Sequence, residues 1–180
     1  MSSRHTPVDL FGENGMRANL PINLINVADT QEIPNSQEIF VYRDCGASII
    51  IDILQKADIE DPEAAAKFHL DAIAEENDSM EHHSIIMQRP ITNDLSPIVL
   101  DGRQVLKKAG SIHHLRTLFA LFRVKGKNHD VVVSFNIPIE TGQGRGRNGA
   151  VTVEQEQLIA LDFYRAVDSL RIVDYNLFAV

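Results

Sequence analysis

The sequence predicts an α+β fold, in which a twisted, mainly antiparallel sheet of about six strands is flanked by helices as an α/β/α sandwich. Strand-like apolar runs recur along most of the chain, and several are joined by short turn sequences that are typical of hairpins. Only two segments combine helical periodicity with capping signals. A length of 180 residues fits one domain, so we expect a single domain over 1–180 with 1–8 as a loose tail.

Strands are expected on both sides of a polar loop at 30–36. Before it, residues 10–12 and 16–20 form a short hairpin that turns between Gly12 and Gly15 and ends at Pro21. After it come two strand-like runs, Gln37–Tyr42 and Ser48–Leu54. The segment at 22–28 is moderately apolar and leads into the loop.

A helix is predicted over Pro62–Glu76. Asp61 is suited to the N-cap and Pro62 to the first helical position, and Glu63 suits the positive end of the helix dipole. The expected buried stripe consists of Ala65, Phe68, Ala72 and Ile73.

Further strands are expected between residues 81 and 137. The segment at 81–89 is one, and 98–100 is joined to 103–107 by the turn signal Asp101-Gly102. Residues 111–124 have features of both helix and strand; we favour a strand, which forms a long hairpin with 130–137 around Gly126–Asn128 and which Pro138 ends.

The second helix is predicted to open at Thr152. Residues 152–155 match a capping box, and the expected buried stripe comprises Ile159, Phe163, Ala166, Val167 and Leu170. The segment at 172–178 is predicted to be a short extended tail, held by Leu177 and Phe178.

The charge of the chain is concentrated in one window. The formal net charge is −8, and residues 29–63 contain nine acids and two bases. A solvated acidic face and a docking surface for a basic partner both fit this pattern. The negative charge argues against nucleic-acid binding. We also expect no membrane span, no secretory signal and, with Cys45 alone, no intrachain disulfide.

Catalytic and cofactor motifs are weak. The Gly- and Arg-rich segment at 141–149 lacks the Lys-Ser/Thr of a P-loop, and Cys45 has no neighbouring base. The pairs His82-His83 and His113-His114 need a third ligand, such as Glu81 or His69, to hold a metal. We therefore expect a binding protein with no catalytic residue, metal or cofactor. A small enzyme using the histidines is the alternative from another class.

Several segments together resemble the Ran guanine-nucleotide release factor family. They are Leu10-Phe11-Gly12, the run QEIPNSQEIFV at 31–41, SIIIDIL at 48–54, AAAKFH at 64–69, DGRQ at 101–104, DVVVSFNIP at 130–138, and the ending from Val173 to Phe178. The match spans nearly the whole chain in order. The family pattern has Asp where this chain has Asn35, often Glu where it has Gln55, and a second Gly where Glu13-Asn14 stand.

The resemblance implies a protein that binds the GTPase Ran, promotes release of its guanine nucleotide and supports nuclear protein import. The implied fold is a twisted sheet between helices, similar to the photosystem II extrinsic protein P. Ran in its GTP- or GDP-bound form is the expected partner, with or without a second Ran-binding protein. We expect a monomer in nucleus and cytoplasm; the alternative is a module of the same fold with a different basic partner.

The implied Ran-contact residues lie on the acidic stretch. They are Asp29, Glu32, Asn35, Gln37, Glu38, Asp44, Asp52 and Gln55. Asp52 interrupts an apolar strand, where an ionised carboxylate is costly to bury without a partner. We expect it to face outward, aligned with Glu38 in one docking face. A structural ion pair with Lys56 or an arginine is the alternative.

Overall fold

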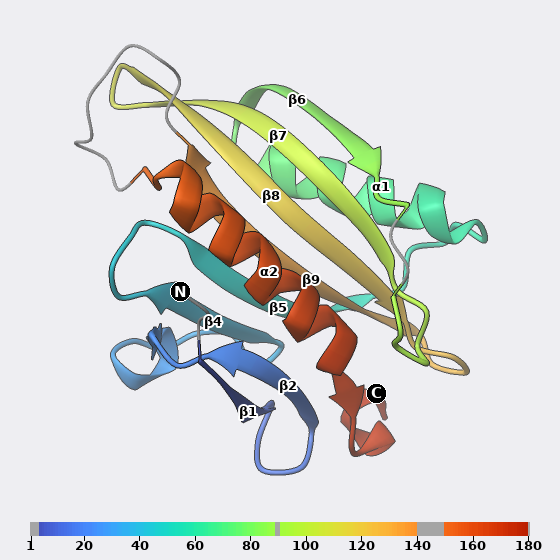
Figure 1. Ribbon diagram of the computed structural model, residues 1–180. Helices are drawn as coiled ribbons and strands as arrows, with labels where there is room; N and C mark the ends of the chain where they lie inside the picture. The colour runs from blue at the N-terminus through green and yellow to red at the C-terminus, as the bar shows by residue number, and fades with distance from the viewer. Residues whose placement is uncertain (1–3, 89–90, 140–149, 180) are drawn as a thin grey trace.

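The computed structural model describes residues 4–88, 91–139 and 150–179. Their strands form a large twisted sheet and a small one (Figure 1). In spatial order the large sheet comprises β3 (Leu24–Asn26), β4 (Gln37–Tyr42), β5 (Ser48–Gln55), β9 (His129–Ile139), β8 (Ser111–Arg123), β7 (Ile98–Lys108) and β6 (Ser79–Ile86). All neighbouring strands are antiparallel.

The small sheet and the helices cover the large sheet. The small sheet has the order β1 (His5–Leu10), β2 (Met16–Pro21) and β10 (Arg171–Ile172). Helix α2 (Val153–Ser169) crosses one face of the large sheet, and α1 (Pro62–Glu76) lies behind β6 and β7 on the other (Figure 1). The predicted α+β fold is confirmed, with seven strands in the large sheet where about six were expected.

The main core lies between the large sheet, α2 and the small sheet. At its centre the rings of Phe135 and Phe163 meet edge to face, with centroids 5.3 Å apart. A second cluster forms between α1 and the sheet around Leu70, Phe119 and Leu121. The five residues predicted as the buried stripe of the second helix are all buried. In the described residues, no helix is long and apolar enough to cross a membrane.

Both helices begin where their caps predict. The Asp61 side chain accepts a hydrogen bond from Ala64 N, 2.8 Å away, and α1 has the predicted bounds. Thr152 and Gln155 form the reciprocal capping box of α2. The predicted stripe of α1 is wrong at Phe68, whose exposed fraction is 53%. The helix is rotated relative to that prediction, because its short residues Ala65 and Ala66 face the sheet.

The predicted turn at Asp101-Gly102 is wrong. Strand β7 runs through both residues, and the hairpin to β8 turns at Ala109 and Gly110 instead. The close packing of α1 explains the glycine within this strand, because a Cβ added at position 102 would lie 3.0 Å from Leu70 Cδ2 of α1.

The N-terminal segment departs from the expected loose tail. Strand β1 starts at His5, so that prediction is wrong over 5–8. His5 Nε2 lies 2.8 Å from Asp162 Oδ1 of α2, and Tyr42 Oη donates to Asp162 Oδ2 at 3.0 Å. These contacts connect β1, β4 and α2. The C-terminal segment at 172–178, predicted to be extended, is also not purely extended, since η2 (Tyr175–Phe178) is a 3-10 helix.

Candidate functional site

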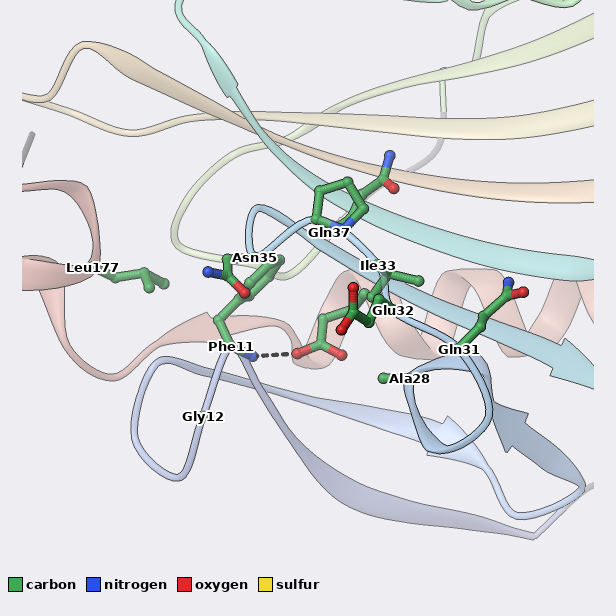
Figure 2. A pocket seen from close by; sticks show the side chains of 11 residues that line it. Phe11, Gly12, Ala28, Gln31, Glu32, Ile33, Asn35, Gln37 and Leu177 are labelled. Carbon is green, nitrogen blue, oxygen red and sulfur yellow. Dashed lines mark hydrogen bonds between the residues drawn. The ribbon is translucent and has the colours of Figure 1, made fainter.

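A groove of about 690 Å³ opens where three distant segments meet: the tip of the β1–β2 hairpin, the loop before β4, and the C-terminal tail (Figure 2). It is lined by Phe11, Gly12, Ala28, Gln31, Glu32, Ile33, Pro34, Asn35, Gln37, Glu38 and Leu177. Four of the predicted contact residues are therefore brought together here, with apolar side chains beside them. A groove with acidic and apolar walls is suited to a partner segment that carries both a basic and an apolar side chain.

Glu38 connects the groove to the hairpin tip. Its Oε1 accepts a hydrogen bond from Phe11 N, and the two atoms are 2.6 Å apart (Figure 2). Phe11 has φ +57° and Gly12 has φ +90°, so the backbone there adopts a conformation that non-glycine residues rarely take. Glu38 thus stabilises a strained turn as well as presenting a carboxylate to the groove.

The loop before β4 holds the next two acids. It starts with the short η1 helix (Val27–Asp29), capped by Asn26, whose side chain accepts from Ala28 N at 2.9 Å. Asp29 and Glu32 are both exposed in this loop. Their charges are consequently available to a partner.

Asp52 lies at the same end of the sheet as Glu38. It is directly opposite Gln37 in the β4–β5 ladder, and the Gln37 side chain forms a hydrogen bond with it. Burial raises the pKa of Asp52 above its ordinary value; the Gln37 hydrogen bond acts against this increase, and the Glu76 charge adds to it.

The expected alignment of Asp52 with Glu38 is wrong. Glu38 is opposite Ile51, so it shares a face with the buried Ile51 and Phe40, toward the main core. Asp52 projects from the other face. The alternative, an ion pair of Asp52 with a base, is also not found among the described residues.

The remaining two predicted residues lie apart from each other. Gln55 is exposed at the end of β5, so it belongs to the same end of the sheet as Asp52. Asp44 follows the far end of β4, six residues from Glu38 and hence roughly 20 Å along the strand, where Asn23 Nδ2 donates to it at 3.3 Å. The structure therefore groups seven of the eight residues, without Asp44, as the acidic end of the sheet: Asp29, Glu32, Asn35, Gln37, Glu38, Asp52 and Gln55.

The four carboxylates at the acidic end of the sheet, like many other acids in the described parts of the chain, form no ion pair. Ion pairs there involve Asp9, Asp71, Asp101, Asp130, Glu156 and Asp162. None includes one of the four carboxylates at the acidic end. Their negative charge is uncompensated within the described chain, which favours attraction of a basic surface.

Alternative chemistries receive no support from the described residues. They contain no group of three or more His, Cys, Asp or Glu side chains arranged to hold a metal ion. His82 contacts Asp71 at 3.3 Å, and His69 contacts the buried Asp130 at 2.9 Å. Burial, and to a lesser degree the Asp44 charge, raise the pKa of the Cys45 thiol, which disfavours the thiolate. The Gly-rich segment at 141–149 lies outside the described residues.

Several residues of this region were not among the predicted contacts. Phe11 and Leu177 line the groove, and Glu76 of α1 acts on Asp52 by its charge. The first two belong to segments that carry the family resemblance, which is a sequence signal for them. Glu76 reaches Asp52 only through the packing of α1, which no local pattern indicates.

Comparisons with known proteins agree on one family. The sequence profile described as "Ran-interacting Mog1 protein" matches residues 8–138. The chain is 25% identical over 181 residues to the zebrafish (Danio rerio) Ran guanine nucleotide release factor, covering 94% of this chain and 97% of that protein. It is 27% identical over 178 residues to the human (Homo sapiens) protein of the same name, covering 94% of each.

Yeast proteins extend the comparison to the fold. The nuclear import protein MOG1 of Saccharomyces cerevisiae is 23% identical over 192 residues, covering 99% of this chain and 87% of that protein. The crystal structure of the Saccharomyces cerevisiae Ran-binding protein Mog1p superposes with a TM-score of 0.77 at 22% identity, covering 98% of this chain and 100% of that chain. The two chains share a fold.

Proposed function

The chain belongs to the Ran-interacting Mog1 protein family, and we propose that it binds the GTPase Ran, promotes release of the bound guanine nucleotide and acts in nuclear protein import. The observation that carries the proposal is the family match over residues 8–138, which includes the loop at 27–36 and strands β4 and β5. We propose no catalytic residue. For a role in import we propose that the chain is present in both nucleus and cytoplasm. Fractionation of cells that express a tagged chain tests this location.

The proposed Ran-contact surface is the acidic end of the sheet. Its carboxylates are not neutralised by ion pairs within the described chain, and the groove beside them offers apolar contacts from Phe11, Ile33 and Leu177. A basic surface of Ran that covers this end touches Glu38 from one face and Asp52 from the other. Asp44 lies outside this surface, at the far end of β4.

Nucleotide release follows if this surface binds nucleotide-free Ran more tightly than nucleotide-bound Ran. A partner shifts a conformational equilibrium only by its difference in affinity for the two states. Asn35 and Gln55 stand where the resemblance leads one to expect acids. The electrostatic attraction is accordingly weaker than in a chain that has both carboxylates, and it decreases further as salt screens the charges.

The rate at which Ran releases its guanine nucleotide tests the proposal. Ran is loaded with a fluorescent guanine nucleotide and mixed with the chain, in excess unlabelled nucleotide, at several salt concentrations. We expect the parent to accelerate release and the double variant Glu32→Lys/Asp52→Lys to slow it by at least about tenfold, because two attractive contacts become repulsive. We choose Glu32 for the reversal and not Glu38, because Glu38 also stabilises the hairpin tip.

A matched control separates the local effect from net charge. Glu154→Lys, compared with the single variants Glu32→Lys and Asp52→Lys, makes the same charge reversal on an exposed residue in the first turn of α2, at the end of the helix away from the C-terminal tail (Figure 1). Release as fast in the double variant as in the parent contradicts the proposed surface. Failure of the parent to bind Ran in a low-salt pull-down contradicts the function itself and favours a different basic partner.

A further inference from the structure

Strand β6 is the longest edge strand among the described residues, and it is regular from Glu81 to Ile86 after a shift in its register with β7 between Ser79 and Glu81. Exposed edges offer unpaired backbone groups, and natural proteins shorten them, interrupt them with β-bulges, or place Pro or charged residues such as Lys on them. Of the other edges in the described residues, β3 has three residues and β10 has two, while β1 contains Pro7. β6 has eight residues, SMEHHSII, without Pro or Lys, and lies at the outside of the sheet beyond β7 (Figure 1).

The outer edge of β6 also carries exposed apolar side chains. The exposed fraction is 57% for Met80 and 60% for Ile85. The hydrogen-bond pattern between β6 and β7 shows which backbone groups of β6 point outward. Met87 N donates to Val99 O at 2.9 Å, and bonded and non-bonded pairs alternate in an antiparallel ladder. The N–H and C=O groups of His82, Ser84 and Ile86 are therefore directed away from β7.

In contrast to the monomer expected from the resemblance, we propose that β6 pairs with β6 of a second copy of this chain, in an antiparallel register centred on His82. The two large sheets then form one continuous sheet across a two-fold axis. In this register Glu81 of each copy lies opposite His83 of the other, in a pair without backbone hydrogen bonds, where facing side chains come closest.

The charges on this face of the sheet favour that register. His83 lies opposite Arg103, and Arg103 lies opposite Arg116, so one imidazole and two guanidinium groups form a row across β6, β7 and β8 that ends at the open edge. Arg116 is compensated by Asp101 at 2.6 Å and Glu156 at 2.9 Å, whereas Arg103 reaches Glu156 only at 3.9 Å. Glu81 of a second copy extends the row with the opposite charge, twice per dimer.

The other face is compatible with the same pairing. There the two His82 side chains meet at the axis, and each lies 3.3 Å from Asp71 of its own α1. The proposal uses a surface separate from the acidic end of the sheet, so it does not depend on the proposed Ran binding.

Sedimentation of the full chain over a range of concentrations tests the proposal. We expect a concentration-dependent dimer for the parent and for Ser84→Ala, and a monomer for Ser84→Pro. Proline removes the outward N–H of Ser84 without removing a bond to β7. Circular dichroism and thermal unfolding establish that each variant is folded.

A charge exchange tests the register even if Ser84→Pro does not fold. Glu81→Lys alone adds a cation to the end of the row that contains Arg103, and His83→Glu alone places two carboxylates opposite one another, so we expect each to weaken the dimer about tenfold. The double variant places Lys opposite Glu and should recover the parent affinity. A monomer at every concentration, or a dimer unaffected by Ser84→Pro, overturns the proposal. A dimer that Ser84→Pro breaks but that shows no recovery in the double variant overturns the register centred on His82.

Discussion

Glu38 and Asp52 lie on adjacent strands at one end of the large sheet and project from its opposite faces. Glu38 accepts a hydrogen bond from the hairpin tip at Phe11 N, whereas Asp52 is opposite Gln37 on the other side. A partner that touches both must therefore cover the end of the sheet, not one face of it. This geometry allows the two carboxylates to be tested separately.

Asp52→Asn is expected to leave the fold as stable as the parent, or to stabilise it, while weakening Ran binding. Burial raises the pKa of Asp52, so the folded state favours the protonated carboxyl. The parent then loses stability as the pH rises through the unfolded pKa of about 3.9 toward the higher folded pKa. At pH values above the folded pKa, we expect the free energy of unfolding of the variant to exceed that of the parent by an amount on the order of a few tenths of a kcal/mol. The difference is small because solvent screens a half-buried group.

Urea unfolding of parent and Asp52→Asn at pH 3 and pH 7 measures this difference. The advantage of the variant should be present at pH 7 and shrink at pH 3. A variant that is clearly less stable at pH 7 would show that the Asp52 carboxylate supports the fold, and would count against its assignment to a recognition surface.

Glu38 is expected to combine two roles that two substitutions separate. Glu38→Ala removes the acceptor of Phe11 N and should destabilise the fold by about 1–3 kcal/mol, with faster hydrogen exchange at the hairpin tip. Glu38→Gln retains an oxygen acceptor but loses the charge. It should preserve most of the stability and still weaken Ran binding. Equal loss of stability in both variants contradicts the role of the hydrogen bond.

The sequence predicted those parts of the fold that depend on local signals. Caps at Asp61 and Thr152 set the starts of both helices, and apolar runs located β4, β5, β8 and β9. The turn at Asp101-Gly102 failed because a glycine required by packing against Leu70 has the same local sequence as a hairpin turn. No local signal distinguishes the two.

The geometry of the candidate site could not be predicted from the sequence, and the contact role of its residues stays a prediction. Alternation along each strand was correct, with Phe40 and Ile51 buried. The relative facing of Glu38 and Asp52 depends on the register between β4 and β5, which is determined by the connection at 43–47. Composition does not determine that register, and neither does the periodicity of either strand.

Asp130 is expected to make stability depend on acid pH. It is fully buried, and although burial itself raises its pKa, hydrogen bonds from His69 and Ala57 N and the Arg123 charge hold the pKa below the ordinary value of 3.8. A lowered folded pKa stabilises the fold above the unfolded pKa, and that contribution is lost as the pH falls through the folded pKa.

Asp130→Asn should therefore cost roughly 3 kcal/mol at pH 7, the scale for breaking a buried charged pair. The difference from the parent should narrow below about pH 4. Thermal unfolding between pH 2 and pH 7, chosen to bracket these pKa values, measures it. Asp94→Asn, in an exposed loop, is the control and should behave like the parent. A pH-independent difference would mean that the Asp130 charge does not contribute as proposed.

Gly102 and Leu70 are expected to be energetically coupled, because α1 approaches β7 at this glycine. A Cβ at position 102 lies 3.0 Å from Leu70 Cδ2, so Gly102→Ala should destabilise the fold by about 1–3 kcal/mol through overpacking. Leu70→Ala should cost about 2–5 kcal/mol through the cavity it leaves. In the double variant the added methyl group enters that cavity, so the combined loss should be smaller than the sum of the single losses. Urea unfolding of the four chains measures the coupling. Additive losses would mean that the backbone of β7 moves to accept the methyl group, and that contact with Leu70 is not what requires glycine within this strand.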